Sequence, residues 1–270
     1  PNSALNESWN GSSWTEVGDL VAAQKQQGAS GTYTSALSYA GSVPGSPDIT
    51  GKTQSWDGSS WTETSALSTA RYFLGGSGAS NVAALAFGGL NASDSVQNAT
   101  EEWSFSGLPP STPAANYSNA IVGQVYYNSS TGQFKSISDG GAPIGTWASG
   151  GNLNTARGEL TGVGLQTAGL VFGGTTSSYL AITEQYDGSS WTEVADLNTA
   201  RATMAGAGTY TAAIAAGGAA VPTYYNNTET WNGSAWTEVN NLNNSRGYLA
   251  GAGQGTTTAS LVFGGHAPPQ

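Results

Sequence analysis

The chain has 270 residues, enough for one large all-β domain, and its 7 basic and 17 acidic residues give a net charge of −10. This balance leaves no basic stripe for nucleic-acid phosphates or an anionic membrane. With no cysteine there is no disulfide framework or thiol chemistry, and no apolar run is long enough to be inserted in a membrane. Because the chain begins at Pro1 without Met, we expect a processed chain or a piece of a longer one.

The first predicted elements are strands at Leu5–Trp9 and Trp14–Leu20, joined by Asn-Gly-Ser-Ser. They belong to a sequence repeat that occurs five times. In its full form the repeat has an aromatic residue, then Asn or Asp, Gly, Ser, and either Ser or Ala, followed by Trp-Thr-Glu and, further on, a Leu and an Arg. Asn, Asp and Gly tolerate positive φ, so the connection predicts a hairpin turn with the two aromatic slots facing each other. We interpret these slots as structural core between repeats. The slots hold Trp9, Trp14, Trp56, Trp61, Trp103, Trp147, Tyr186, Trp191, Trp231 and Trp236.

Each repeat predicts two further strands. One follows the Arg, as at Tyr72–Gly78 and Gly247–Gly253, and its small residues suit a crowded position where strands converge. The next is a short apolar run ending in Gly or Gly-Gly, such as residues 170–174. Four antiparallel strands in a repeat of roughly 45 residues, with periodic Gly and Trp, predict the blade of a β-propeller.

The second complete repeat carries an insertion at residues 107–146, between its third and fourth strands. The insertion opens with a Pro-rich linker. It continues with an alternating segment around Asn-Ser-Ser-Thr-Gly that predicts a hairpin bearing Tyr126, Tyr127 and Phe134. We expect residues 1–270 to form a single propeller domain with this insertion inside its second blade.

The chain ends with the first two strands of a repeat, at Tyr248–Gly253 and Ser260–Gly265, and begins with the last two. We therefore expect five blades, the fifth closed by N-terminal strands pairing with C-terminal strands. Ring closure of this kind removes long free sheet edges.

Gly-Gly, an aromatic some residues later and then a Trp resemble the kelch repeat, although the spacing between the aromatic and the Trp is shorter than usual. The chain is thus similar to kelch-like β-propellers. Its Trp-Asn-Gly-Ser-Ser-Trp-Thr-Glu-Val units, with Asn-Thr-Ala-Arg and Phe-Gly-Gly, resemble repeats in structural proteins of marine and environmental bacteriophages. The Gly-x-x-Tyr-Tyr-Asn segment of the insertion resembles one common in phage tail and fibre proteins. The copper chemistry of kelch-like oxidases does not carry over, because its Cys ligand is missing and His266 is the only histidine.

Four repeats carry Arg at one slot, and we expect Arg71, Arg157, Arg201 and Arg246 to ring one mouth of the channel. A Glu or Gln precedes each first aromatic by two residues. Gln24 replaces the Arg, and Gln54 the Glu, within one predicted blade. Loss of both charges together favours Arg–Glu ion pairs inside the other blades, since a lone buried charge is costly. The alternative is an Arg ring that binds an anionic ligand.

No other residue set predicts catalysis, a metal site or a cofactor. The carboxylates that could form a glycosidase pair occupy equivalent repeat positions, which indicates a structural role. They are Glu16, Glu63, Glu193 and Glu238. Aromatics that break the repeat are better contact candidates, namely Tyr126, Tyr127, Phe134, Tyr224 and Tyr225.

The resemblance implies a non-enzymatic virion module of a phage tail, fibre or capsid surface, part of a larger assembly. Its expected partners are other virion proteins or host surface glycan, and its expected location is the virion surface. The alternatives are an extracellular lectin-like module of a microbe and a propeller glycan hydrolase. A glycan array separates binding from pure scaffolding, and a carboxylate pair that breaks the symmetry inside a pocket would favour the hydrolase.

Overall fold

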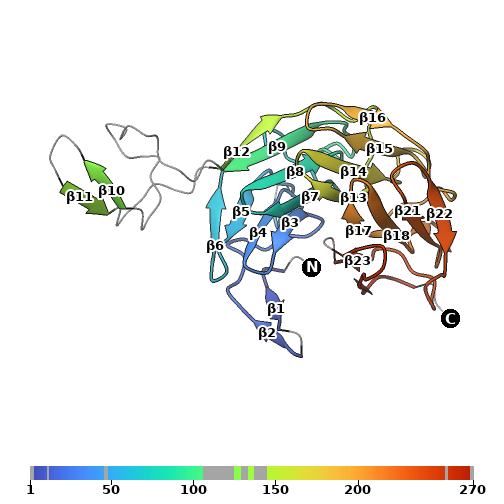
Figure 1. Cartoon of the computed structure of the whole chain (residues 1–270), viewed down its shortest axis with the longest axis horizontal. Coiled ribbons are helices and arrows are strands. Elements are labelled where there is room, and N and C mark those ends of the chain that lie inside the picture. Colours follow the sequence, from blue (N-terminus) through green and yellow to red (C-terminus); the bar gives the residue numbers. More distant parts are fainter. Residues whose placement is uncertain are drawn as a thin grey trace.

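The computed structural model confirms an all-β chain with a propeller-like arrangement (Figure 1). The residues it describes are 3–10, 12–45, 48–105, 125–128, 133–136, 145–252 and 255–267. These segments contain strands and no helix. Side chains are described for all of them except residues 125–128 and 133–136, where only the strands are given.

Four four-stranded antiparallel sheets form four blades around a common centre. The first contains β3 (Gly28–Thr32), β4 (Ser35–Tyr39), β5 (Thr53–Trp56) and β6 (Trp61–Thr64). The second contains β7 (Gly75–Ser80), β8 (Ala83–Phe87), β9 (Thr100–Phe105) and β12 (Gly145–Ser149). The third contains β13 (Thr161–Leu165), β14 (Ala168–Phe172), β15 (Thr183–Tyr186) and β16 (Trp191–Glu193). The fourth contains β17 (Ala205–Thr209), β18 (Ala212–Ala216), β21 (Thr228–Trp231) and β22 (Trp236–Val239).

Four smaller sheets complete the described chain. The N-terminal hairpin β1 (Glu7–Trp9)–β2 (Trp14–Glu16) and the C-terminal pair β23 (Ala250–Gly251)–β24 (Val262–Phe263) are separate two-stranded sheets. They lie apart, at the two sides of the opening in the ring (Figure 1). The fifth blade therefore remains a prediction. The other two sheets pair β10 (Val125–Asn128) with β11 (Gln133–Ser136), and β19 (Ala219–Ala220) with β20 (Thr223–Tyr224).

The innermost strands begin later than the sequence predicts. The predicted strand Tyr72–Gly78 is β7, which starts at Gly75, and Gly247–Gly253 contains only the short β23. The reason is a left-handed residue between the Arg and the strand, such as Phe73 with φ 51°. A left-handed residue breaks extended pairing, so the segment before it belongs to a loop.

The turn between the two outer strands has the predicted chemistry. Trp231 of β21 lies opposite Trp236 of β22, with ring centroids 5.5 Å apart. The Asn232 side chain accepts hydrogen bonds from the backbone N–H groups of Ser234 and Ala235, both at 2.9 Å. Gly233, with φ 96°, occupies the left-handed position of this turn. The same geometry recurs at Asp57 and Asp187.

The turn at Asp187 should make stability depend on pH. Backbone hydrogen bonds from Ser190 and Ser189 and the Ser189 hydroxyl lower the Asp187 pKa from 3.8 to about 2. A lowered carboxyl pKa contributes stability that is complete above the ordinary value and is lost as pH falls through the lowered one. Asp187→Asn should copy the Asn232 turn and remove this contribution. We expect the thermal midpoint of the wild type to fall more steeply than that of Asp187→Asn between pH 4 and 2. Parallel curves would show that the turn charge has no such role.

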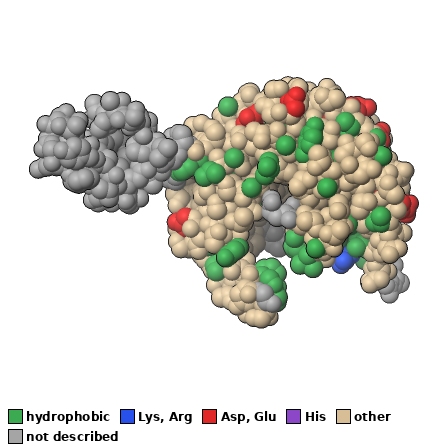
Figure 2. Space-filling model, viewed as in Figure 1, with side chains coloured by type: hydrophobic (Ala, Val, Ile, Leu, Met, Phe, Trp, Pro, Cys, Tyr) green, Lys and Arg blue, Asp and Glu red, His purple; other side chains and the backbone are tan. Residues whose placement is uncertain are grey.

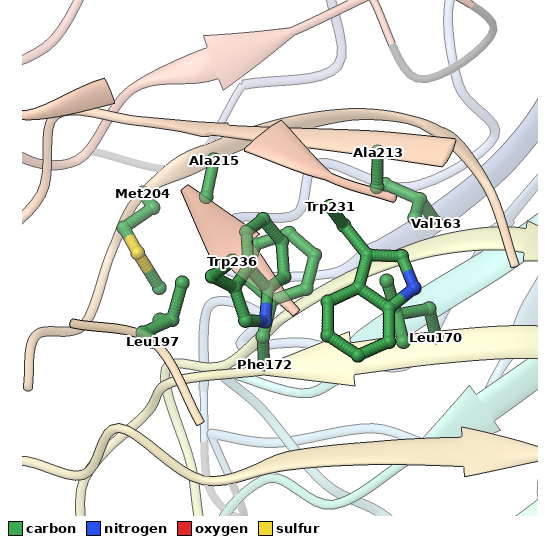
Figure 3. Close-up of a cluster of buried hydrophobic side chains, with 9 residues drawn as sticks. All are labelled: Val163, Leu170, Phe172, Leu197, Met204, Ala213, Ala215, Trp231 and Trp236. Atoms are coloured by element: carbon green, nitrogen blue, oxygen red, sulfur yellow. The ribbon is translucent and has the colours of Figure 1, made fainter. Parts of the chain in front are cut away.

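Aromatic side chains of the second strand hold neighbouring blades together (Figure 3). Phe172 on β14 packs edge-on against Trp236 of the next blade, with centroids 4.9 Å apart. Tyr39 and Phe87 pack in the same way against Trp147 and Trp191. The small residues of the inner strands follow from this packing. A Cβ on Gly162 would lie 2.2 Å from the Phe87 ring, so a side chain there would displace the interface.

Hydrogen bonds reinforce the same interfaces. The indole Nε1 atoms of Trp147, Trp191 and Trp236 donate to threonine hydroxyls of the preceding blade at 2.9, 2.9 and 3.0 Å. The acceptors are Thr53, Thr100 and Thr183, each the first residue of the third strand. Six of the ten aromatics have the predicted core position: Trp56, Trp103, Tyr186, Trp191, Trp231 and Trp236 are buried. Trp61 and Trp147 are half-buried, and the core role fails for Trp9 and Trp14, which are 47% and 60% exposed. These two lie on the N-terminal hairpin, which has no neighbouring blade against its outer face.

Candidate functional site

Buried ion pairs lie within three of the blades. Arg71 pairs with Glu101 at 2.8 Å, Arg157 with Glu184, and Arg201 with Glu229 at 2.5 Å. The three arginine side chains have no exposed surface. Each guanidinium also donates to the backbone carbonyl of the first Gly in its Gly-Gly pair, at 2.8–2.9 Å. Arg71, Arg157 and Arg201 are therefore engaged in holding strands together, which favours the structural interpretation of this slot.

The carboxylates of these pairs also tie adjacent blades together. Glu184 accepts hydrogen bonds from the backbone and side-chain amides of Asn154, and Glu229 accepts the same pair from Asn198. Glu101 accepts from the Ser68 backbone at 2.7 Å. The donors lie in the connection that enters each blade from the preceding one. The ion pair thus joins two strands of one blade to the connection from its neighbour.

The first blade uses two buried glutamines in place of the ion pair. Gln24 and Gln54 are 3% and 1% exposed. Gln54 Oε1 accepts from the Val21 backbone at 2.6 Å, the same role as Glu101 in the next blade. Gln24 Oε1 accepts from the Ser38 hydroxyl at 3.3 Å. Because the Arg and the Glu are both replaced in this blade, no single charge is left buried without its partner.

Arg246 differs from the other three arginines. It is half-buried, and its Nη1 donates to the Gly264 carbonyl at 3.1 Å. The ion pairs found in the described part of the chain do not include it. Its Nε atom is buried without a hydrogen-bond partner. The strand that follows Arg246, β23, lies beside the opening of the ring (Figure 1).

Five residues in left-handed conformation encircle one end of the propeller. They are Gln26, Phe73, Glu159, Thr203 and Tyr248, each two residues after the Gln or Arg of its repeat, with φ between 51° and 58°. Backbone hydrogen bonds join neighbours: Phe73 donates to Gln26, Glu159 to Phe73, and Thr203 to Glu159, at 3.0–3.1 Å. The register slips at the opening, where Leu249 instead of Tyr248 donates to Thr203.

We call this end the loop face and define it by the five left-handed residues with Tyr72, Tyr179 and Tyr224. Sequence reasoning missed it, because the five left-handed positions share no residue type. Only their constant offset from the Arg slot could have revealed them. Five of its residues carry aromatic rings: Tyr72, Phe73, Tyr179, Tyr224 and Tyr248. The loop face is where the near-identical blades differ from one another.

Carboxylates accompany these tyrosines. The Tyr72 hydroxyl donates to Asp94, and this hydrogen bond, burial and the charges of Asp94, Asp48 and Glu159 raise the Tyr72 pKa to about 12. Burial raises the Glu159 pKa. Burial first, and then the Glu159 charge and Tyr179 and Tyr224, raise the Tyr248 pKa. The charge of the Glu159 carboxylate therefore helps to raise the pKa values of tyrosines in two different repeats, Tyr72 and Tyr248.

The sequence-predicted contact residues divide into two groups. Tyr224 and Tyr225 lie at the loop face of the fourth blade and are half-buried, with the Tyr224 ring 5.3 Å from His266. The side chains of Tyr126, Tyr127 and Phe134 lie outside the described residues. Their strands β10 and β11 pair as a hairpin, in sequence between β9 and β12 of the second blade, with Tyr127 opposite Phe134 in the register.

A cavity of about 830 Å³ occupies the centre of the ring, where Figure 2 shows a hollow. Its walls combine glycine, alanine, serine and threonine of the inner strands with larger side chains, among them Tyr33, Trp61, Leu74, Leu160 and Met204. None of the described residues that line it is charged. The symmetric carboxylates Glu16, Glu63, Glu193 and Glu238 are instead exposed on the outermost strands. Among the described residues, the cavity therefore offers backbone groups, small side chains and a few large apolar or aromatic ones, without an acid–base pair.

Among the described residues, no group of three or more His, Asp or Glu could hold a metal ion. The same residues include no helix long and apolar enough to cross a membrane. No family model matches this chain, and no curated protein matches it.

Proposed function

We propose that the chain is a five-bladed, kelch-like propeller whose fifth blade combines β23–β24 with β1–β2. Unsatisfied atoms at the opening support this closure. Each blade interface should contain a Trp Nε1 that donates to the first residue of a third strand. At the opening, Trp61 Nε1 and Thr228 Oγ1 occupy these positions and are buried without hydrogen-bond partners. By repeat position, the N-terminal hairpin supplies Asn6 to Trp61 and Trp14 to Thr228.

The same equivalence gives Arg246 its missing partner. Glu7 on β1 corresponds to Glu101, Glu184 and Glu229, and it is exposed in this structure. In the closed ring Glu7 pairs with Arg246 and accepts from Asn243, the counterpart of Asn154 and Asn198. Closure also covers large apolar side chains at the opening, among them Trp14, Leu261 and Phe263, which are 60%, 63% and 44% exposed. Burying them stabilises the ring by the hydrophobic effect.

As its function, we propose a non-enzymatic attachment module of a bacteriophage virion, in a tail fibre, appendage or capsid surface. The observation that carries this proposal is that residues which recur from blade to blade and residues which do not recur lie in different parts of the molecule. The recurring Arg–Glu pairs and most of the recurring aromatics are buried in the blades and their interfaces, whereas several groups that do not recur, among them Tyr72, Tyr248 and Glu159, lie on the loop face. A surface of half-exposed tyrosines suits contact with a host glycan or another virion protein. The phage assignment rests on the sequence resemblance.

Replacing residues 108–143 with a short Asn-Gly-Ser turn tests the part of the insertion in this function. β9 and β12 pair directly, with Phe105 opposite Gly145, so a short turn can join their ends. We expect the trimmed protein to fold with an unchanged thermal midpoint and to lose particle incorporation or host adsorption. Normal assembly and adsorption would place attachment on the loop face alone.

A glycan array tests attachment by the propeller itself. We expect the isolated domain to bind one class of surface glycan or, failing that, to cross-link to a neighbouring virion protein in the native particle. A domain that does neither would contradict the proposed function.

A further inference from the structure

The carboxylate of Glu159 is the one charged group in the ring of five left-handed residues. It is half-buried, and within the described chain its oxygens accept no hydrogen bond and join no ion pair. The other carboxylates buried in the blades, Glu101, Glu184 and Glu229, each have an arginine and an amide donor. A carboxylate withdrawn from water without a partner is unfavourable for the folded protein alone.

Tyrosines of neighbouring repeats lie near this carboxylate, whose charge helps to raise the pKa values of Tyr72 and Tyr248. Its backbone N–H donates to Phe73, and the Phe73 ring lies 5.2 Å from that of Tyr72. Gly158, next to Glu159, forms an antiparallel β-bridge with Thr175, and Thr175 forms another with Tyr179. Gln26 and Thr203 occupy equivalent positions of the same ring. A cation at Glu159 would thus have aromatic faces nearby for cation–π attraction and neutral polar groups for hydrogen bonds.

The charges on this side of the molecule favour a cationic ligand. The charges of Asp48, Asp94 and Glu159 all raise the Tyr72 pKa, whereas the one basic residue directly beside a member of the ring is Lys25, which precedes Gln26 and whose backbone forms a β-bridge with Ser42. Arg157, which precedes Glu159 by two residues, is fully buried and paired with Glu184. An anionic glycan would meet repulsion here, and an acidic protein surface would as well.

We propose that the loop face binds a glycan through a free amino sugar, whose ammonium group pairs with Glu159 while its ring packs against Tyr248 and Tyr72. The hydroxyl groups beside a sugar amine match the neutral polar side chain of Gln26, which the aliphatic stem of a lysine does not. This inference rests on the proposed attachment function and names the ligand class of its site.

Two oligosaccharides of equal length test the pairing. Titration calorimetry at mildly acidic pH compares a glucosamine tetramer, whose amines are protonated, with the neutral N-acetylglucosamine tetramer. We expect the charged tetramer to bind at least about tenfold more tightly, and Glu159→Gln to abolish that difference. Glu193→Gln is the matched control, because Glu193 is an exposed carboxylate on the outermost strand of the same blade. It should leave both affinities unchanged.

The aromatic contribution has its own pair of variants. Tyr248→Ala should weaken binding of the glucosamine tetramer about fivefold, whereas Tyr33→Ala should not. Tyr33 is 78% exposed at the turn between β3 and β4. Thermal unfolding of each variant checks that it folds, and Glu159→Gln should be at least as stable as the wild type because it removes an unpaired charge.

Three results would overturn the inference: equal binding of the two tetramers, unchanged binding by Glu159→Gln, or a tetralysine peptide that binds as tightly as the sugar. The same experiments test the proposed attachment function separately from the amino-sugar inference. If the domain binds neither tetramer but recognises another glycan on the array or a virion protein, the amino-sugar inference fails and the attachment function stands.

Discussion

Arg201→Ala should lower the free energy of unfolding by about 3–5 kcal/mol, the usual cost of removing one partner from a buried ion pair. The side chains of Arg201 and Glu229 are 0% and 1% exposed. The substitution leaves the Glu229 carboxylate buried with only its Asn198 donors. For a chain of this size the thermal midpoint should fall by roughly 10 °C. Chemical denaturation of the wild type and variant provides the measurement.

A double-mutant cycle separates the pair from its surroundings. Arg201→Gln with Glu229→Gln recreates the glutamine pair of the first blade, so it should be more stable than the Arg201→Gln single variant. Gln24 and Gln54 show that two buried amides can occupy these positions. Additive costs in the cycle would contradict the pairing as an energetic unit.

Deleting residues 1–20 should lower the thermal midpoint by at least about 10 °C and cause aggregation. The deletion removes Trp9 and Trp14, whose burial in a fifth blade would stabilise the ring by about 1.5–3 kcal/mol for each side chain. It also removes Glu7, the proposed partner of Arg246. The hairpin is largely exposed while the ring stays open, so its loss would then have little effect on stability.

The cycle of Glu7→Ala and Arg246→Ala is the point-substitution counterpart of that deletion. Coupling between the two variants is expected from closure, because their side chains then form the fifth member of the Arg–Glu series. An unchanged melting curve after deletion, together with an uncoupled cycle, would show that the termini do not complete a blade.

Much of the blade could be predicted from the sequence because its features repeat. The facing of Trp231 and Trp236 follows from a four-residue turn with Asn and Gly. The pairing of Arg201 with Glu229 follows from the joint loss of both charges at Gln24 and Gln54. In each case the same residue types recur at the same spacing, so one physical cause explains several copies.

The loop face could not be predicted in this way. Phe73 and Glu159 are left-handed because backbone hydrogen bonds between blades hold them there, and no residue type marks that constraint. Strand propensity extended the inner strands through these positions, so their starts were predicted too early. The grouping of Tyr72 and Tyr248 with Glu159 depends on ring geometry, which brings together residues far apart in the sequence.

The most direct test of the closed ring is a cysteine pair across the opening. Strand equivalence places Leu261 of the C-terminal segment opposite Ser8 of β1, as Leu85 lies opposite Glu102. The natural chain has no cysteine, so Ser8→Cys with Leu261→Cys can form a single disulfide. Closure predicts an intramolecular disulfide under mild oxidation, seen as a compact monomer on a non-reducing gel with a raised thermal midpoint. Free thiols or disulfide-linked dimers would contradict it.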